Sequence, residues 1–236
     1  MTTHTATLWM QRTGMLILIM FCATLLGIGV RCYLSEYYVV AATRGEKSTA
    51  EFENFLRTAL ALNQDNGFAN NEQAKVRAQQ RKFDEMLVYL NKSMTTLRPL
   101  AYYEQLGYAY DNMSVAAKEP EKIRYAQLSA DAYKKVVLAN PTDVSSFEAL
   151  MLNAYRSGND GELESLARKV RALDRDNKNE IYLRALAAER AQNFATARNL
   201  LQMISQDRDS SRRLFFKPED VKRRLATMTE TTSKPL

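Results

Sequence analysis

A long uncharged stretch near the N-terminus constrains this chain more than any other feature of its sequence. The stretch runs from Thr13 to Val30, between Arg12 and Arg31, and reads TGMLILIMFCATLLGIGV. As an α-helix it would span roughly 27 Å at about 1.5 Å per residue, close to the thickness of a bilayer's hydrocarbon core. Aromatic residues on both sides of it suit the two membrane interfaces. We therefore expect a transmembrane helix over residues 13–31, in contact with membrane lipid.

A cleaved signal peptide is the alternative interpretation of the same stretch. Its apolar core is long for a signal peptide, and small residues suited to cleavage occur only near Val40, well past the core. The number of Lys and Arg residues slightly favours a cytoplasmic C-terminal part, but long domains cross membranes largely regardless of charge. A short N-terminal tail commonly stays inside. We favour an uncleaved single-pass anchor, in a bacterial inner membrane, with the C-terminal part outside the cytoplasm.

The residues that usually carry catalysis or hold metals are scarce. The chain has one His, His4, and two Cys, Cys22 and Cys32, which argues against a His- or Cys-based metal site and against a disulfide framework. It contains neither a Gly-rich phosphate loop nor a nucleophile elbow. Neighbouring carboxylates such as Asp84 and Glu85 are typical of a solvated helix surface. We expect no catalytic residue, metal, cofactor or small-molecule substrate, and therefore no enzyme.

The net charge of +6 arises from 33 basic and 27 acidic residues. Nucleic-acid-binding proteins carry a concentrated basic face, whereas charges of both signs are mixed here. A basic cluster between Arg208 and Arg224 is interrupted by acidic residues. The charge pattern therefore favours a solvated surface and predicts no nucleic-acid partner.

From Ser48 onward the sequence has the pattern of helices. Ser48 and Glu51 form a capping box, in which a hydroxyl and a carboxylate three positions later satisfy free amides at a helix start. Asn63–Asn71 reads NQDNGFANN, is rich in turn formers, and is predicted to be a loop. Pro218, followed by two acidic residues, predicts a late helix start. Residues from Thr229 onward are expected to be a disordered tail.

Several segments of the helical part share a pattern. Four of them read RKFDEMLVYLNKSMTTLRP from Arg81, YKKVVLANP from Tyr133, ALDRDN from Ala172 and NFATARNLLQMI from Asn193. Each resembles the second helix, or the exit from it, of a tetratricopeptide repeat (TPR). The segment YEQLGYAY, from Tyr103 to Tyr110, resembles the first helix of that family, with an aromatic, a Leu-Gly pair and a Tyr at the family's spacing.

At a period of about 34 residues, the resemblance gives four repeats at about 67–99, 100–141, 144–177 and 178–210. The family's small packing positions are filled by Gly107, Ser129, Ala185 and Ala197. The first repeat departs from the family at Arg77, where an aromatic is usual. The second carries an insertion around 113–122, which is expected to lengthen both of its helices. An unrelated helical bundle is the alternative.

The resemblance implies an all-α fold, in which an N-terminal transmembrane helix is followed by a TPR-like α-solenoid of helix pairs. A solenoid needs a polar cap at its open end to stay soluble, and the helix expected after Pro218 would supply one. The expected segments are an N-terminal tail (1–12), the transmembrane helix (13–31), a juxtamembrane segment and helix (32–66), the repeats (67–210), and a capping helix with a tail (211–236).

TPR proteins usually bind partners in a concave groove lined by first helices, where Tyr and Arg are typical anchors. The family's groove positions give nine partner-binding candidates: Tyr108, Asp111, Asn112, Leu152, Tyr155, Arg156, Tyr182, Glu189 and Arg190. The set lacks the combination of Lys, Asn and Arg with which chaperone-binding TPR domains hold a terminal carboxylate. The resemblance implies a membrane-anchored scaffold or adaptor for protein partners, such as subunits of a membrane complex. The alternative is a fixed accessory structural subunit of a larger integral membrane complex, which it contacts through the transmembrane helix.

Overall fold

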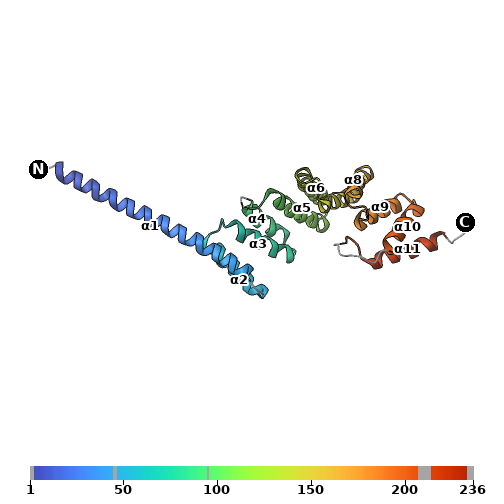
Figure 1. The fold of residues 1–236 in the computed structure, drawn as a ribbon, viewed down its shortest axis with the longest axis horizontal. Helices are drawn as coiled ribbons and strands as arrows, with labels where there is room; N and C mark the ends of the chain where they lie inside the picture. Colours follow the sequence, from blue (N-terminus) through green and yellow to red (C-terminus); the bar gives the residue numbers. More distant parts are fainter. Residues whose placement is uncertain (1–2, 45–46, 95, 207–213, 233–236) are drawn as a thin grey trace. The chain divides into compact units, whose positions relative to one another are not determined.

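The computed structural model describes residues 3–44, 47–94, 96–206 and 214–232 of the chain. Within these residues every regular element is an α-helix, so the predicted all-α class is confirmed. The helices follow one another as shown in Figure 1: α1 (Thr3–Thr43), α2 (Thr49–Leu62), α3 (Gly67–Gln79), α4 (Phe83–Ser93), α5 (Pro99–Ala116), α6 (Glu121–Ala139), α7 (Val144–Arg156), α8 (Asp160–Leu173), α9 (Lys178–Arg190), α10 (Phe194–Gln206) and α11 (Pro218–Thr232). The chain forms two compact units, Met1–Tyr102 and Tyr103–Leu236, each described by itself below.

Helix α1 contains the uncharged stretch and continues well beyond it. Among the described residues, one segment is long and apolar enough to cross a membrane, Met15–Thr43, with a mean hydropathy of 2.2 and none of its most apolar window buried. By length and composition such a helix suits a membrane span or a signal sequence. Residues 32–43, predicted to be a juxtamembrane segment, are helical and extend α1 without a break.

The last turns of α1 belong to the core of the first unit. Ser35 is fully buried, and its hydroxyl donates a hydrogen bond to the carbonyl of Ala59 in α2 at 2.8 Å. Val39 and Ala42 are also buried, packed against α2 and α3. Helix α2 begins at the predicted capping box, where Ser48 accepts a hydrogen bond from the Glu51 amide. Because the side chains of α1 and α2 interlock, these two helices form one structural block.

The predicted loop at Asn63–Asn71 is wrong in its second half, because α3 begins at Gly67. Asn66 caps the helix by accepting a hydrogen bond from the amide of Ala69 at 2.9 Å. Asn70 lies within the helix, and its side-chain amide donates to the carbonyls of Gln64 and Asn66, each at 2.9 Å. Residues that commonly form turns are therefore used here to start a helix.

The second unit consists of helix pairs stacked along the chain, which confirms the predicted α-solenoid. In the first of these pairs the hydroxyl of Ser129 in α6 donates to the carbonyl of Gly107 in α5 at 3.0 Å. A Cβ at Gly107 would lie 2.8 Å from the ring of Tyr133. Ala185 and Ala197, the corresponding small residues of α9 and α10, are buried. The small residues therefore lie where paired helices approach most closely.

The insertion in the second repeat lengthens both of its helices, as predicted. Helix α5 has 18 residues and α6 has 19, whereas α7, α9 and α10 have 13 each. Pro120 lies immediately before α6, at its N-cap.

Helix α11 starts at Pro218, as predicted, and packs its apolar side against the last repeat. Val221 and Met228 are buried in one cluster with Leu201 and Ile204 of α10. The helix continues to Thr232, so the expected tail is helical over 229–232, and residues 233–236 lie outside the described part.

Candidate functional site

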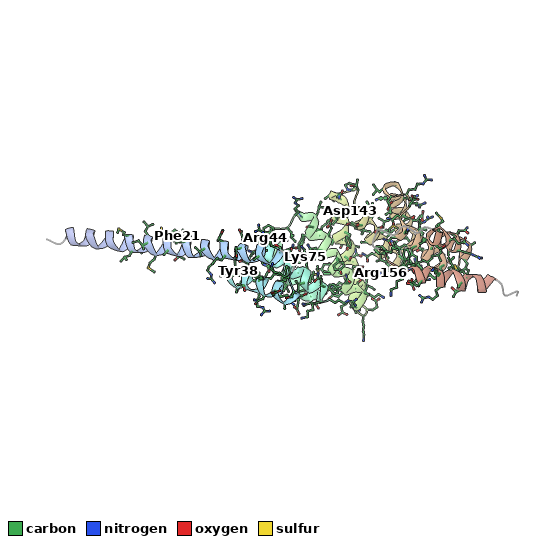
Figure 2. All side chains as sticks on the ribbon, turned by 60° about the horizontal axis from the view of Figure 1, so that its bottom comes forward. Phe21, Tyr38, Arg44, Lys75, Asp143 and Arg156 are labelled. Carbon is green, nitrogen blue, oxygen red and sulfur yellow. The ribbon has the colours of Figure 1, made fainter. Side chains whose placement is uncertain are left out.

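The nine candidate residues of the second unit come from three first helices, α5, α7 and α9. Helices α7 and α9 each have 13 residues and end in an arginine. Asp143 is the N-cap residue of α7 and Arg156 is its last residue; both are labelled in Figure 2. Because the two helices have the same length and repeat offset, equivalent residues fall at equivalent places along them.

Three equally spaced arginines join each first helix to the one before it. They are Arg156, Arg190 and Arg224, each one repeat period after the last (190 − 156 = 34 and 224 − 190 = 34). Arg156 of α7 forms an ion pair with Asp111 of α5. Arg224 of α11 forms an ion pair with Glu189 of α9. The candidate residues are therefore partly engaged with one another, and the recurrence continues into α11.

Arg190 of α9 makes the middle contact of this series. Its Nη1 donates to the carbonyl oxygen of Tyr155 at 2.7 Å, and its guanidinium carbon lies 4.8 Å from the centre of the Tyr155 ring. It also pairs with Asp160, the first residue of α8. A planar guanidinium can make a hydrogen bond, a ring contact and an ion pair together, which a lysine ammonium does less well.

Asp111 is the candidate carboxylate with the clearest electrostatic signature. Burial raises the pKa of Asp111 above its ordinary value, and the neighbouring Arg156 guanidinium opposes this without cancelling it. Nearby, the side-chain amide of Asn112 donates to the carbonyl of Tyr108 at 2.8 Å. This end of the candidate set is half-buried and polar, and it holds a carboxylate whose charge is only partly compensated.

Leu152 and Tyr155 lie on α7 and contribute to packing. Both are half-buried and contact the apolar cluster around Phe147 and Met151. Tyr155 also contacts the next cluster along the solenoid, which contains Leu201. These two side chains bridge adjacent repeats and leave only part of their surface to a partner.

The α9 end of the candidate set is covered by the C-terminal segment. Tyr182 is only 7% exposed, and its ring stacks on Phe216 with centroids 4.2 Å apart. Burial acts to lower the pKa of Arg224, but the ion pair with Glu189 and the interaction with Tyr182 together outweigh it and raise that pKa. Arg190 stays exposed on α9, so the accessible candidates are Arg156, Arg190 and the half-buried residues of α5.

Sequence reasoning missed Phe216 and Arg224, although a signal was present. Each lies one repeat period after a candidate, Tyr182 and Arg190 respectively (216 − 182 = 34 and 224 − 190 = 34). Extending the repeat period by one more unit would have placed both residues beside α9.

A buried carboxylate was also missed. Glu180 of α9 is fully buried, with Arg171 Nε at 3.0 Å and Arg184 Nη1 at 3.5 Å from its Oε1. Burial raises the pKa of Glu180, and the two arginines offset this only in part. Its position between helices indicates a role in joining α8 to α9. Within the described part of the chain, no group of three or more His, Cys, Asp or Glu side chains is arranged to hold a metal ion.

Solved structures similar to this one include TPR proteins. One is YrrB, described as a TPR protein with an unusual peptide-binding site (TM-score 0.54, 13% identity, 78% of this chain and 84% of that one). Another is TTC0263, a thermophilic TPR protein in Thermus thermophilus (TM-score 0.56, 15% identity, 86% and 99%). A third is the MamA protein (TM-score 0.52, 13% identity, 79% and 98%). No protein-family model and no curated protein matches the chain. The likeness shows a TPR-like fold.

Proposed function

We propose that this chain is a membrane-anchored scaffold whose helical repeats bind protein partners in a membrane-associated assembly. The proposal is carried by the TPR-like solenoid, whose first helices present recurring Tyr and Arg side chains. Stacked helix pairs present an extended surface suited to a peptide or protein partner. The peptide-binding site named for the similar protein YrrB supports the same kind of ligand.

The open part of the binding surface lies on α5 and α7 in this proposal. Tyr108, Asp111, Asn112 and Arg156 combine an aromatic ring with charged and amide groups, the composition of a hot spot. Arg190 adds an exposed guanidinium to this surface. Tyr182 and Glu189 complete it when a partner competes with the contacts that Phe216 and Arg224 make. Helix α1 holds the assembly at the bilayer, in a single pass, with the repeats outside the cytoplasm.

The alternative, a fixed accessory subunit that contacts its complex through α1, is favoured by one observation. The side chains of α1 from Met15 to Val30 are exposed, and they present Gly27 and Gly29 with nothing within 4 Å. Small residues of this kind let another membrane helix approach closely.

Exchanging the anchor separates the two functions. Residues 13–31 are replaced by an unrelated transmembrane helix, and chains that co-purify from detergent-solubilised membranes are identified by mass spectrometry. A scaffold that works through its repeats keeps its partners. Loss of the same partners, with the exchanged chain still in the membrane, would favour the accessory subunit.

A further inference from the structure

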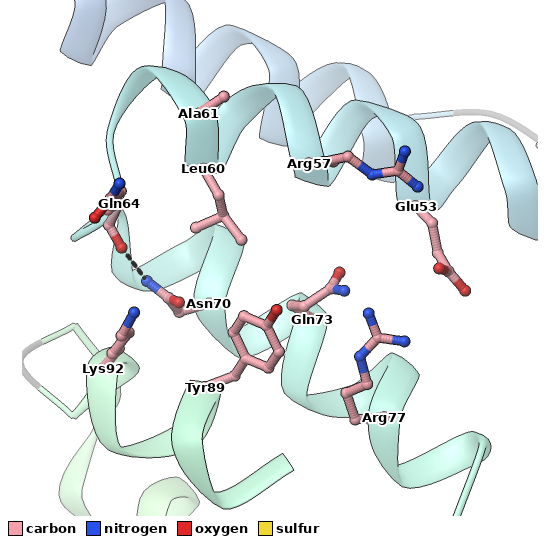
Figure 3. Close-up of a pocket in the computed structure, with 10 residues that line it drawn as sticks. All are labelled: Glu53, Arg57, Leu60, Ala61, Gln64, Asn70, Gln73, Arg77, Tyr89 and Lys92. Carbon is pink, nitrogen blue, oxygen red and sulfur yellow. Dashed lines mark hydrogen bonds between the residues drawn. The ribbon is translucent and has the colours of Figure 1, made fainter. Parts of the chain in front are cut away.

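The first unit contains a polar pocket that the scaffold function does not use. It has a volume of about 380 Å³ and lies between α2, α3 and α4 (Figure 3). The residues that give it its chemistry are Arg57, Gln64, Asn70, Gln73, Tyr89 and Lys92. Figure 3 shows these residues around the pocket; they come from α2, α3 and α4 and, for Gln64, from the loop between α2 and α3.

This pocket exists because one face of α3 is polar where a packing face is expected to be apolar. Asn70 and Gln73 lie on that face and are 1% and 6% exposed. The corresponding side chains of the second repeat are Tyr103 and Leu106 (103 − 70 = 33 and 106 − 73 = 33). Burying two amide side chains in place of an aromatic and a leucine is unfavourable unless their polar atoms form hydrogen bonds.

Both amides keep a free acceptor. Within the described part of the chain, Asn70 Oδ1 and Gln73 Oε1 accept no hydrogen bond although both atoms are buried. The orientation of Asn70 is set by its Nδ2, which donates to the carbonyls of Gln64 and Asn66. Buried acceptors without protein donors are normally satisfied by an ordered water or by a bound ligand, so a donor from outside the chain fits here.

The same pocket carries more positive charge than the protein compensates. Arg57 and Lys92 pair with no carboxylate among the described residues, whereas Arg77 pairs with Glu85 at 3.1 Å. Glu53 also lines the pocket, and its partner at 2.7 Å is the neutral amide of Gln80, so its carboxylate offsets one of these positive charges and leaves the pocket net positive. Two free cations beside a phenol hydroxyl are suited to a phosphate, which takes several charge-assisted hydrogen bonds.

The position of the pocket beside the end of the uncharged stretch of α1 indicates where such a phosphate would come from. Helix α2 runs back along α1, so that Asn63 Nδ2 lies 3.8 Å from Cys32 Sγ and Asn66 Nδ2 lies 2.9 Å from Ser35 Oγ. Cys32 follows Arg31, where the uncharged stretch has ended. The Gln64 end of the pocket therefore lies beside Cys32 and Ser35 of α1, which are about 2 Å and 6 Å beyond Arg31 along the axis of that helix. The headgroup layer on each side of a bilayer is of similar depth, roughly 5–8 Å.

We propose that this pocket binds the phosphate-bearing headgroup of an anionic phospholipid, an inference that rests on the membrane anchoring proposed above. Arg57 and Lys92 pair with the phosphate, and the hydroxyl of Tyr89 donates to it. The amide oxygens of Asn70 and Gln73 accept from headgroup hydroxyls. A glycerol headgroup supplies such hydroxyls, whereas a choline headgroup has no N–H or O–H donor.

The test uses the full chain in detergent micelles, titrated with phosphatidylglycerol or phosphatidylcholine and monitored by native mass spectrometry. The variant is Arg57→Gln with Lys92→Gln. The matched control is Lys75→Gln with Arg98→Gln, which removes two exposed charges of the same unit from outside the pocket. We expect phosphatidylglycerol to bind at least tenfold more tightly than phosphatidylcholine, and this preference to disappear in the pocket variant but not in the control. Tyr89→Phe, which keeps the ring, should weaken binding severalfold.

Three results would overturn the proposal. Equal losses in the pocket variant and the control would indicate diffuse attraction between charges and lipid. Competition by soluble sn-glycerol 3-phosphate at the affinity of the lipid would identify a water-soluble ligand. Unchanged lipid binding in a pocket variant that loses a co-purifying protein would identify a protein site. Partner retention by the same variants tests the proposed scaffold function, and carbonate extraction tests the membrane anchor. A wrong proposal about either one can therefore be told apart from a wrong proposal about the pocket.

Discussion

Gly107 lies in α5 against the ring of Tyr133 in α6, where a Cβ would be 2.8 Å from the ring atoms. We predict that Gly107→Leu overpacks this contact and costs about 1–3 kcal/mol or more of unfolding free energy, measured by thermal or urea unfolding followed by circular dichroism. Gly161 is the control, because the nearest atom to its added Cβ would be 3.9 Å away. Gly161→Ala should be neutral or slightly stabilising. Equal stability of the wild type and Gly107→Leu would invalidate the repeat alignment at this residue.

Glu180 gives a prediction with a defined pH dependence. Its pKa is raised in the folded state because burial outweighs the attraction of Arg184 and Arg171. Between the ordinary value of 4.5 and the raised value, the folded state holds more protons than the unfolded state, so this group's contribution to stability falls as the pH rises.

Glu180→Gln removes that dependence. The stability of the variant relative to the wild type should therefore increase as the pH is raised from about 4.5 toward 8, as measured by urea unfolding at several pH values. A difference between variant and wild type that is flat, or that decreases with pH, would contradict the assigned direction.

At the scale of the element, α11 extends the stack by one more first helix. Phe216 is 8% exposed and stacks on Tyr182, whereas the adjacent Phe215 is 38% exposed. We predict that Phe216→Ala costs about 3 kcal/mol of unfolding free energy and that Phe215→Ala costs less than about 1 kcal/mol. Comparing the two unfolding midpoints checks whether the segment that leads into α11 belongs to the core, with a change of the same size in neighbouring residues. Similar midpoints would mean that the C-terminal segment is not part of the core.

The end of α1 gives a second prediction at this scale. Ser35, Val39 and Ala42 are buried against α2 and α3, so a truncation that stops at residue 44 removes part of the first unit's core. Deleting residues 1–31 should leave a soluble, fully helical chain. Deleting residues 1–44 should lower its melting temperature and expose Leu56 and Ala59, detected by binding of a hydrophobic dye. The same melting temperature for both truncations would contradict the packing described for α1.

Local signals in the sequence predicted much of the fold. The capping box at Ser48 and the proline at 218 mark helix starts, because these residues satisfy or lack specific backbone amides. The loop predicted at Asn63–Asn71 fails because the same Asn side chains serve as a helix cap. Local composition does not distinguish a turn from a cap, since both uses satisfy backbone groups in the same way.

The candidate site was less predictable, because it depends on contacts between distant residues. The pairing of Arg156 with Asp111 joins residues in two different helices, and no spacing within either helix reveals it. The pocket beside Asn70 follows from three helices together. The sequence itself shows only the regular spacing of the arginines, and following that spacing one repeat further leads to Arg224.

The protein should have two independent attachments, one to the membrane and one to its partners. Helix α1 should keep the protein in the membrane pellet after a carbonate wash, because about 18 apolar residues bury far more surface than a peripheral contact. Release into the supernatant would mean that the N-terminal segment has been cleaved or does not span a membrane. The repeats should retain partners whether or not the anchor is native.

The dissociation constant of a co-purifying partner, measured for the full chain and for single-residue variants, tests whether the first helices form a partner-binding surface. Tyr108→Ala and Arg156→Gln alter the open part of the proposed binding surface, and truncating a central anchor costs about 2 kcal/mol or more, roughly a 30-fold weakening. Arg168→Gln removes an exposed charge from α8, a second helix, and should leave the affinity unchanged. Unfolding midpoints of the three variants separate lost binding from lost folding. Unchanged affinity in all three, or an equal loss from Arg168→Gln, would contradict a partner-binding surface on the first helices.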